Sequence, residues 1–426
     1  MKSSSNNPLR HLRAADAIAV ARLATQATAG VARIAEGVHQ SVWSSMGVRG
    51  GTSAGSTRGI TALVYQSVQG INQVVGKGLA SILAALQPVL ERIEGDPAET
   101  PQREAVLAAL NGVLGDRLAA SQNPLATPMT LRYRGATLNW QTPPPRHQVS
   151  DKVLLLIHGL CMNDLQWQAR HDDEVVDHGD ALARTLGYTP VYLRYNTGLH
   201  TSQNGYELAR QLEQLVEHWP TPVAEISILA HSMGGLVTRN ACHEARREGL
   251  RWPEVLKNIV FLGTPHHGAP LERAGNWIDL LLQSTPYSRP LARLARLRSA
   301  GITDLRYGHV LEADWQGRDR FARRPDQRQH LPLPHGVACY AVAATTAAKR
   351  SLLAERLIGD GLVPLNSALG QHDDPQRNLA FDQAAQSIAY RMNHMQLLSS
   401  PQVTRQLLQW LQAAARSPDR ASAAGT

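Results

Sequence analysis

The sequence predicts an α/β protein with a mostly parallel central sheet. Two observations support this class: apolar runs of strand length, and helical stretches that alternate with them. Near-continuous runs of this kind are typical of parallel strands buried on both faces. The runs are KVLLLIHG, PVYLRYN, EISILAHS and NIVFLGTP, and the helical patterns between them lie at about 177–187, 204–218 and 234–248.

The remaining elements of the predicted sheet lie at its two ends. Residues 129–140 alternate in polarity and turn at Arg134-Gly135, which predicts an antiparallel hairpin. Residues 336–345 and 387–393 supply the last strands, and a helix at 401–414 closes the domain. We therefore predict the sheet domain over 126–415, with a lid-like insertion at 270–335 and a disordered tail at 416–426.

A different composition marks residues 1–125, which we predict to be an amphipathic helical extension. Helical patterns cover about 12–42, 57–91 and 102–120, and a Gly/Ser-rich linker separates the first two. The middle pattern carries apolar residues at steps of three and four, which places them on one helix face. They are Ile60, Leu63, Val64, Val68, Ile71, Val74, Val75, Leu79, Ile82, Leu83, Leu86 and Leu90.

Charge and cysteine content exclude several classes of function. The net charge is +8, from 43 Lys and Arg against 35 Asp and Glu. These basic residues are scattered and form no block with interleaved aromatic residues, so we expect no nucleic-acid binding. The three cysteines form neither a disulfide framework nor a CxxC metal pair. Asp16 and Arg22 interrupt the apolar residues near the N-terminus, so we expect no secretory signal and a cytoplasmic protein.

The segment EISILAHSMGGLVTRN carries the candidate nucleophile, Ser232. An apolar strand ends just before this serine and a helix begins just after it, and so sharp a turn requires small residues two positions away on either side. Ala230 and Gly234 occupy these positions, so the segment departs from the pattern G-x-S-x-G by one methyl group. The literal match Gly51-Thr52-Ser53-Ala54-Gly55 follows no strand, and we interpret it as linker.

Acyl transfer by a serine also needs a base, an acid that orients the base, and amide donors for the oxyanion. His158-Gly159 ends a buried strand, so the amides of Leu160 and Met233 are the predicted oxyanion hole. The acid and the base should follow the serine in that order. Asp360 lies in a glycine-flanked loop after the 336–345 run, and His394 lies between the last strand and the last helix. The other candidate acids and bases occupy positions in the chain that fit this order less well. They are Asp304, Asp373, Asp374, His335 and His372.

The motifs IHGL, AHSMGG, LGTPHHG, GDGLVP and MNHMQLL together resemble those of bacterial esterase/lipase-type α/β-hydrolases, including the group related to the inositol-deacylase lipase-like domain. The resemblance covers about 127–415 and implies the α/β-hydrolase fold, ester hydrolysis and no cofactor. It also implies that the loop 264–268 lines the rim of the active site. The histidines predicted to contact substrate are His158, His231, His266 and His267. Adjacent histidines point apart and have no evident carboxylate partner, so we expect no metal at His266 and His267.

Alternatives remain for the reaction and for the N-terminal part. The same triad serves an amidase or a thioesterase, and a lipid- or granule-surface scaffold with an inactive hydrolase domain is the non-enzyme alternative. Trp277 and Leu280–Leu282 are candidates for an apolar lid. The helix of 57–91 needs a partner for its apolar face, because each large side chain gains roughly 1.5–3 kcal/mol on burial. That partner is the hydrolase domain, a second copy of the chain, or a lipid or polyester granule surface. The oligomeric state stays unknown.

Overall fold

The structure is a computed structural model that describes residues 101–171, 174–269, 299–318, 326–348 and 359–416. The predicted helices at 12–42 and 57–91, Trp277 and the Leu280–Leu282 lid, and nearly all of the predicted tail lie outside these residues. The apolar stripe of the N-terminal extension therefore stays a prediction.

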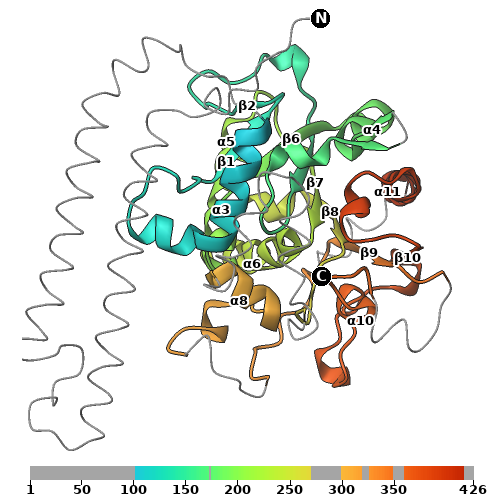
Figure 1. The fold of residues 1–426 in the computed structure, drawn as a ribbon. Helices are drawn as coiled ribbons and strands as arrows, with labels where there is room; N and C mark the ends of the chain where they lie inside the picture. The colour runs from blue at the N-terminus through green and yellow to red at the C-terminus, as the bar shows by residue number, and fades with distance from the viewer. Residues whose placement is uncertain (1–100, 172–173, 270–298, 319–325, 349–358, 417–426) are drawn as a thin grey trace, which may run out of the picture. The chain divides into compact units, whose positions relative to one another are not determined.

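Eight strands form one mixed sheet with the order β2-β1-β6-β3-β7-β8-β9-β10 (Figure 1). The β1-β2 and β1-β6 pairs are antiparallel, and every pair from β6 to β10 is parallel. The strands are β1 (Thr130–Tyr133), β2 (Ala136–Thr137), β3 (Lys152–Ile157), β6 (Thr189–Arg194), β7 (Glu225–His231), β8 (Leu256–Leu262), β9 (Ala338–Thr345) and β10 (Gln386–Tyr390). All strands predicted from the sequence are present, including the hairpin turn at Arg134-Gly135.

Helices cover both faces of the sheet, as the continuous apolar strands require. One face packs on α4 (His178–Leu186) and α11 (Pro401–Arg416), and its core includes Leu154 and Leu156 of β3 and Leu407 of α11. Leu155 and Ile157 alternate with these strand residues and point to the opposite face. There α5 (Thr201–His218) and α6 (Met233–Glu248) pack against each other.

The helix α3 (Pro101–Ala120) lies within the predicted N-terminal extension and contacts the sheet domain. Residues 104–117 form one compact unit with the chain from residue 127 onward, whereas the sequence places the boundary near residue 125. Buried polar contacts explain the difference. Glu104 forms a 2.9 Å ion pair with Arg194 of β6, and the Ser299 hydroxyl donates a 2.6 Å hydrogen bond to the Gly112 carbonyl. Propensity and composition do not reveal such long-range pairs.

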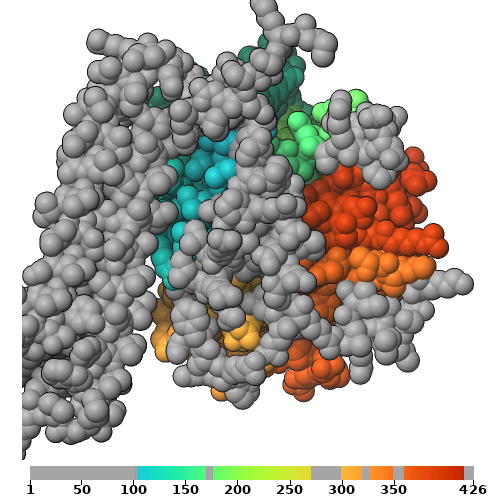
Figure 2. Space-filling model, viewed as in Figure 1, coloured from blue at the N-terminus to red at the C-terminus, as the bar shows by residue number. Residues whose placement is uncertain are grey.

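The remaining elements lie in the connections between strands. The described part of the predicted insertion contributes α8 (Ala300–Tyr307). The sequence does not predict the two-stranded antiparallel sheet of β4 (Ala169–His171) and β5 (Glu174–Val176), because three-residue strands give too short a pattern. After β9 come α10 (Leu365–Ala368) and the 3₁₀ helix η10 (Met395–Leu398). In the space-filling view most of the red segments near the C-terminus lie on the right (Figure 2). Among the helices in the described part of the chain, none has the length and apolar character needed to span a bilayer.

Candidate active site

Ser232 lies between β7 and α6, at the carboxyl edge of the parallel strands. Its φ is 53° and its ψ is −122°, a backbone conformation that residues with a side chain rarely adopt. The position is held by a 2.8 Å hydrogen bond from the Ser232 amide to the Leu262 carbonyl at the end of β8. A strained serine on a strand-to-helix turn is the geometry of a nucleophile elbow.

Two glycines allow other backbone segments to approach this elbow. A Cβ atom on Gly234 would lie 2.6 Å from the Ile157 carbonyl oxygen, so the first turn of α6 packs directly on the end of β3. A Cβ atom on Gly159 would lie 2.9 Å from the Cβ of Ser232. The predicted need for a small residue at 234 therefore has a steric cause, and the His158-Gly159 turn lies beside the serine.

The two amides predicted to form the oxyanion hole come from these segments. Met233 is the first residue of α6, so its amide has no acceptor within the helix. Leu160 follows Gly159, and the chain then turns through Cys161, whose φ is 60°. The Cys161 amide donates a 3.1 Å hydrogen bond to the Thr197 hydroxyl, which holds the turn after Leu160 in place.

Asp360 and His394 lie together in the interior although 34 positions separate them. Nδ1 of His394 donates a 2.6 Å hydrogen bond to Oδ2 of Asp360, and the His394 amide donates a 3.1 Å bond to the Asp360 carbonyl. The other carboxylate oxygen of Asp360 accepts the amides of Leu362 and Val363 at 2.9 and 2.7 Å. The amides of its own loop therefore hold the Asp360 carboxylate in place, and the carboxylate in turn holds the orientation of the His394 ring.

The end of β8 connects this pair to the serine. Leu262 accepts the Ser232 amide, and a Cβ atom on the next residue, Gly263, would lie 3.1 Å from Nδ1 and Cε1 of His394. Within the described residues the Ser232 hydroxyl forms no hydrogen bond with His394. Catalytic hydrogen bonds are often long in unliganded enzymes and tighten when substrate binds.

His231 and His158 are completely buried next to these groups, although the sequence predicts that both contact substrate. The His231 ring lies 4.6 Å from that of His394, and its Nε2 lies 3.2 Å from the His394 carbonyl oxygen. His158 stacks on Tyr195, and burial lowers its pKa to about 4. Burial also holds the pKa of His231 well below its usual range. Both rings are therefore neutral and buried next to the turn that carries Ser232. Their contact with substrate stays a prediction.

The loop 264–268 follows β8, and its two histidines differ in their surroundings. His266 is buried against the edge of Phe261 with the ring centroids 4.9 Å apart, while His267 is half-buried and its Nε2 lies 3.0 Å from the Gly370 carbonyl oxygen. Both line a cavity with Arg239 of α6. A direct role of either ring in substrate binding stays a prediction.

The rival acids and bases lie apart from Ser232. Asp373, Asp374 and His335 are exposed, and His372 faces Asp326 at 3.7 Å. Asp304 of α8 is buried and accepts hydrogen bonds from the ring of His200 at 3.0 Å and the Thr201 amide at 2.7 Å. It thus belongs to a separate histidine cluster that the sequence analysis does not detect, because its partner lies 104 positions away.

The strand order, the elbow after β7 and the later Asp360–His394 pair define the α/β-hydrolase fold, so this sequence prediction is confirmed. A family model described as a domain of unknown function (DUF7379) matches residues 120–311. No curated protein matches this chain.

Several solved structures resemble the chain at low identity. The mature Bacillus licheniformis lipase BlEst2 is 15% identical, with 61% of this chain and 91% of that chain covered and a TM-score of 0.39. Aspergillus fumigatus lipase B is 10% identical, with 68% and 58% covered and a TM-score of 0.39. The type II thioesterase YbtT of yersiniabactin biosynthesis is 13% identical, with 64% and 96% covered and a TM-score of 0.34. The link to the inositol-deacylase group stays a prediction.

Proposed function

We propose that this protein is a serine hydrolase that cleaves carboxylic esters with an apolar acyl part, by way of an acyl-enzyme. One observation supports the proposal most strongly. Ser232 occupies a strained elbow beside the end of β8, and the buried Asp360–His394 pair lies against the same strand end. Together these groups supply a nucleophile, a base and an acid in the chain order of an α/β-hydrolase.

The hydrogen bond to Asp360 decides which nitrogen of His394 acts as base. A carboxylate only accepts hydrogen bonds, so Nδ1 carries the proton and the lone pair of a neutral ring is on Nε2. In the proposed mechanism Nε2 takes the Ser232 proton while the hydroxyl oxygen attacks the ester carbonyl. The amides of Leu160 and Met233 stabilise the oxyanion, and His394 then protonates the leaving alcohol.

Deacylation reverses these roles with water in place of the alcohol. Nε2 of His394 takes a proton from water, the hydroxide attacks the acyl-enzyme, and Ser232 regains its proton as the acid leaves. Every step uses only side chains and amides of this chain. Amides and thioesters react by the same steps, so the choice among the three depends on the substrate site.

Labelling with a fluorophosphonate probe tests the nucleophile. We expect the wild type and Ser53→Ala to be labelled and Ser232→Ala to remain unlabelled. Labelling of Ser232→Ala at the wild-type rate would refute the assignment. A panel of p-nitrophenyl esters from acetate to laurate, with a matched thioester and anilide, then identifies the preferred bond and chain length. Absence of turnover in the whole panel, together with absence of labelling, would favour the inactive scaffold.

A further inference from the structure

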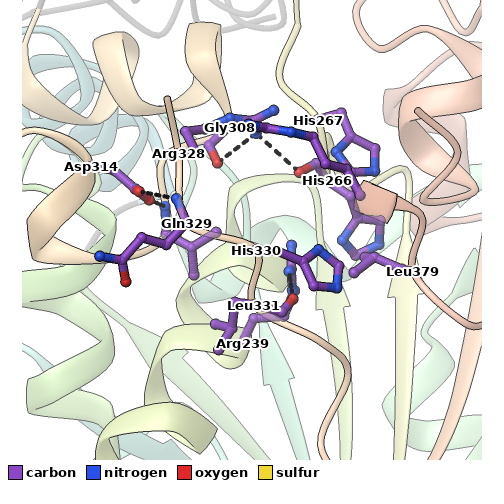
Figure 3. A pocket seen from close by; sticks show the side chains of 12 residues that line it. Arg239, His266, His267, Gly308, Asp314, Arg328, Gln329, His330, Leu331 and Leu379 are labelled. Atoms are coloured by element: carbon purple, nitrogen blue, oxygen red, sulfur yellow. Dashed lines mark hydrogen bonds between the residues drawn. The ribbon is translucent and has the colours of Figure 1, made fainter. Parts of the chain in front are cut away.

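A polar cavity lies beside α6, several residues beyond the elbow (Figure 3). The enclosed space is small, about 20 Å³, and the cavity is partly open to solvent. Arg239 of α6, His266 and His267 after β8, and a chain segment around His330 converge on it. Arg239 follows Ser232 by seven positions, about 10 Å along a helix, and Ser232, Asp360 and His394 are not among the residues that line the cavity.

Arg239 is the most unusual of these groups, because its charge is buried and forms no ion pair with any of the described residues. Its side chain donates a hydrogen bond to the Leu331 carbonyl, while its Nε has no acceptor within the described part of the chain. The residue is only 5% exposed. Burial, reinforced by the nearby Arg328, lowers the pKa of Arg239 to about 10. An unpaired buried cation is costly and normally acquires an anionic partner.

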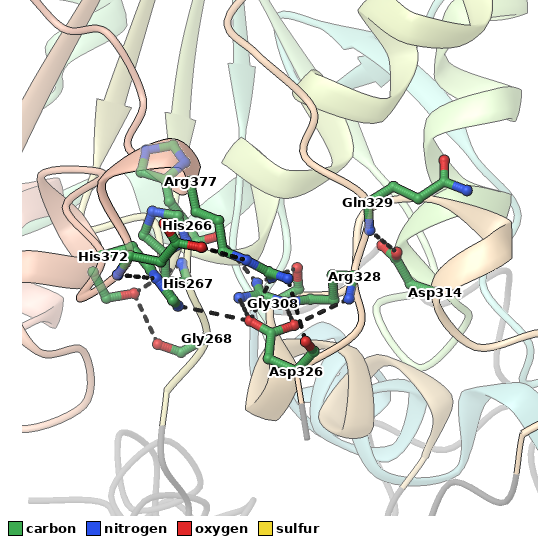
Figure 4. A network of polar contacts seen from close by, with 12 residues as sticks. His266, His267, Gly268, Gly308, Asp314, Asp326, Arg328, Gln329, His372 and Arg377 are labelled. Carbon is green, nitrogen blue, oxygen red and sulfur yellow. Dashed lines mark hydrogen bonds and ion pairs between the residues drawn. The ribbon is translucent and has the colours of Figure 1, made fainter. Parts of the chain in front are cut away.

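The carboxylates around the cavity are engaged elsewhere (Figure 4). Asp314 is buried and accepts the backbone amides of Val310, Leu311 and Gln329 at 2.9 to 3.1 Å. Asp326 pairs with Arg328 at 2.6 Å. It also pairs with Arg377 at 2.9 Å. Neither carboxylate forms an ion pair with Arg239, so this part of the structure supplies no direct counter-charge to it.

His266 adds a second unpartnered group to the same cavity. Its side chain is buried, and within the described residues neither ring nitrogen has a hydrogen-bond partner. Burial keeps its pKa well below the usual range, so the ring is neutral and carries one N–H donor. His330 lines the cavity from an exposed position. A guanidinium with an unused N–H and two imidazoles are suited to an oxyanion rather than to a cation.

We propose that this cavity binds an oxyanion group, a carboxylate or a phosphate, through the guanidinium of Arg239 with the rings of His266 and His330. The proposal is independent of the reaction at Ser232. A second groove shares His330 with the cavity and is lined by apolar residues, among them Pro332 and Leu333, and by polar ones, among them Asp382. We expect the apolar residues of this groove to contact the aliphatic chain of a fatty carboxylate, a contact that a free inorganic anion cannot make.

Calorimetric titration of the full chain with inorganic phosphate, acetate and octanoate, at constant ionic strength, tests the proposal. We expect saturable binding of at least one anion, and a thermal midpoint that rises with its concentration. Arg239→Met should weaken that binding at least tenfold. The variant should fold, because methionine fills the site without an unpaired buried charge. Tightest binding of octanoate identifies a fatty carboxylate, and tightest binding of phosphate a phosphate group.

Arg247→Met is the matched control, since Arg247 lies on the same helix, is 59% exposed and pairs with Glu244. It should bind the anion like the wild type. His330→Ala removes an exposed side chain and should weaken binding severalfold, which keeps the test decisive if Arg239→Met does not fold. Absence of binding by all three anions, or wild-type affinity in either cavity variant, would overturn the proposal.

Discussion

Asp360 holds His394 by two hydrogen bonds, one from Nδ1 of the ring to the carboxylate and one from the His394 amide to the Asp360 carbonyl. Both side chains are 1% exposed, so water does not compete for either bond. The carboxylate is also anchored by the Leu362 and Val363 amides. The pair is therefore arranged before substrate binds, which favours a catalytic role over that of an ordinary surface ion pair.

Replacing Asp360 by asparagine should lower kcat about 10³- to 10⁴-fold while the protein stays folded, since the same change in the triad of a serine protease costs about 10⁴-fold. The asparagine amide can donate a hydrogen bond to Nδ1, which would leave the proton on Nε2 and remove the base. The measurement is ester hydrolysis, with circular dichroism to confirm folding. Asp373→Asn and Asp374→Asn are the controls, because both side chains are exposed. Near-normal turnover of Asp360→Asn would mean that another residue is the acid of the triad.

Replacing Gly159 by alanine should lower kcat, because the turn that carries the Leu160 amide must move. The added Cβ would lie 2.9 Å from the Cβ of Ser232 and 3.1 Å from Nδ1 of His231. Loss of one oxyanion donor costs about 10²- to 10³-fold in kcat, and we expect a loss of that size here. Steady-state kinetics with a short-chain ester measures the loss, and a thermal melt shows whether the variant folds. A folded variant with unchanged kcat would mean that Leu160 is not a donor.

The Asp304 cluster should contribute stability that depends on pH. Burial alone would raise the pKa of Asp304, but hydrogen bonds from His200 and His309 bring it below its ordinary value of 3.8. A carboxyl group whose pKa falls on folding stabilises the fold above its unfolded pKa, and this contribution is lost as pH falls through the folded pKa. Asp304→Asn should therefore lower the free energy of unfolding by about 1–3 kcal/mol at pH 7.

Urea unfolding at a series of pH values checks this prediction. The difference between the wild type and Asp304→Asn should be constant from neutral pH down to about pH 4 and should shrink below it. Asp373→Asn serves as the exposed control and should unfold like the wild type throughout. A difference that persists unchanged into strong acid would show that the carboxylate charge is not the stabilising feature.

Local patterns are sufficient to predict the sheet and the order of the candidate residues. The runs that form β3, β6, β7 and β8 are apolar because both faces of these strands are buried, so the sequence carries the signal directly. Ser232 is detectable because its turn restricts residues 230 and 234, and Asp360 and His394 because the fold fixes where each must follow.

Features built from distant residues are not predictable in this way. Arg239 has the sequence context of an ordinary helical arginine, and only the folded chain shows that it is buried and, among the described residues, has no ion-pair partner. Chain order disfavours Asp304 as the acid, yet no local pattern indicates its pairing with His200. The sequence does not reveal that His158 and His231, the histidines predicted to contact substrate, are completely buried. No pattern in a single sequence distinguishes a buried histidine from one exposed at the edge of the active site.

Two truncations should behave differently, because α3 holds contacts of the hydrolase unit. Deleting residues 1–100 leaves Glu104 in place, so the protein should keep its fluorophosphonate labelling at Ser232. Deleting residues 1–120 removes Glu104 and leaves the buried Arg194 with one fewer anionic partner, and it also removes the Gly112 carbonyl that accepts the Ser299 hydroxyl. Breaking a buried ion pair on one side costs about 3–5 kcal/mol.

The thermal midpoints of the two truncated proteins test this contrast. The longer deletion should melt well below the shorter one, and Glu104→Gln in the full chain should reproduce part of the loss. Equal midpoints for both truncations would show that α3 does not stabilise the hydrolase unit. Sedimentation with lipid or polyester particles, compared between the full chain and the 1–100 deletion, then tests the proposed role of the N-terminal stripe. If only the full chain sediments and the two proteins share one chain-length preference, the stripe is a targeting device rather than a cap over the active site.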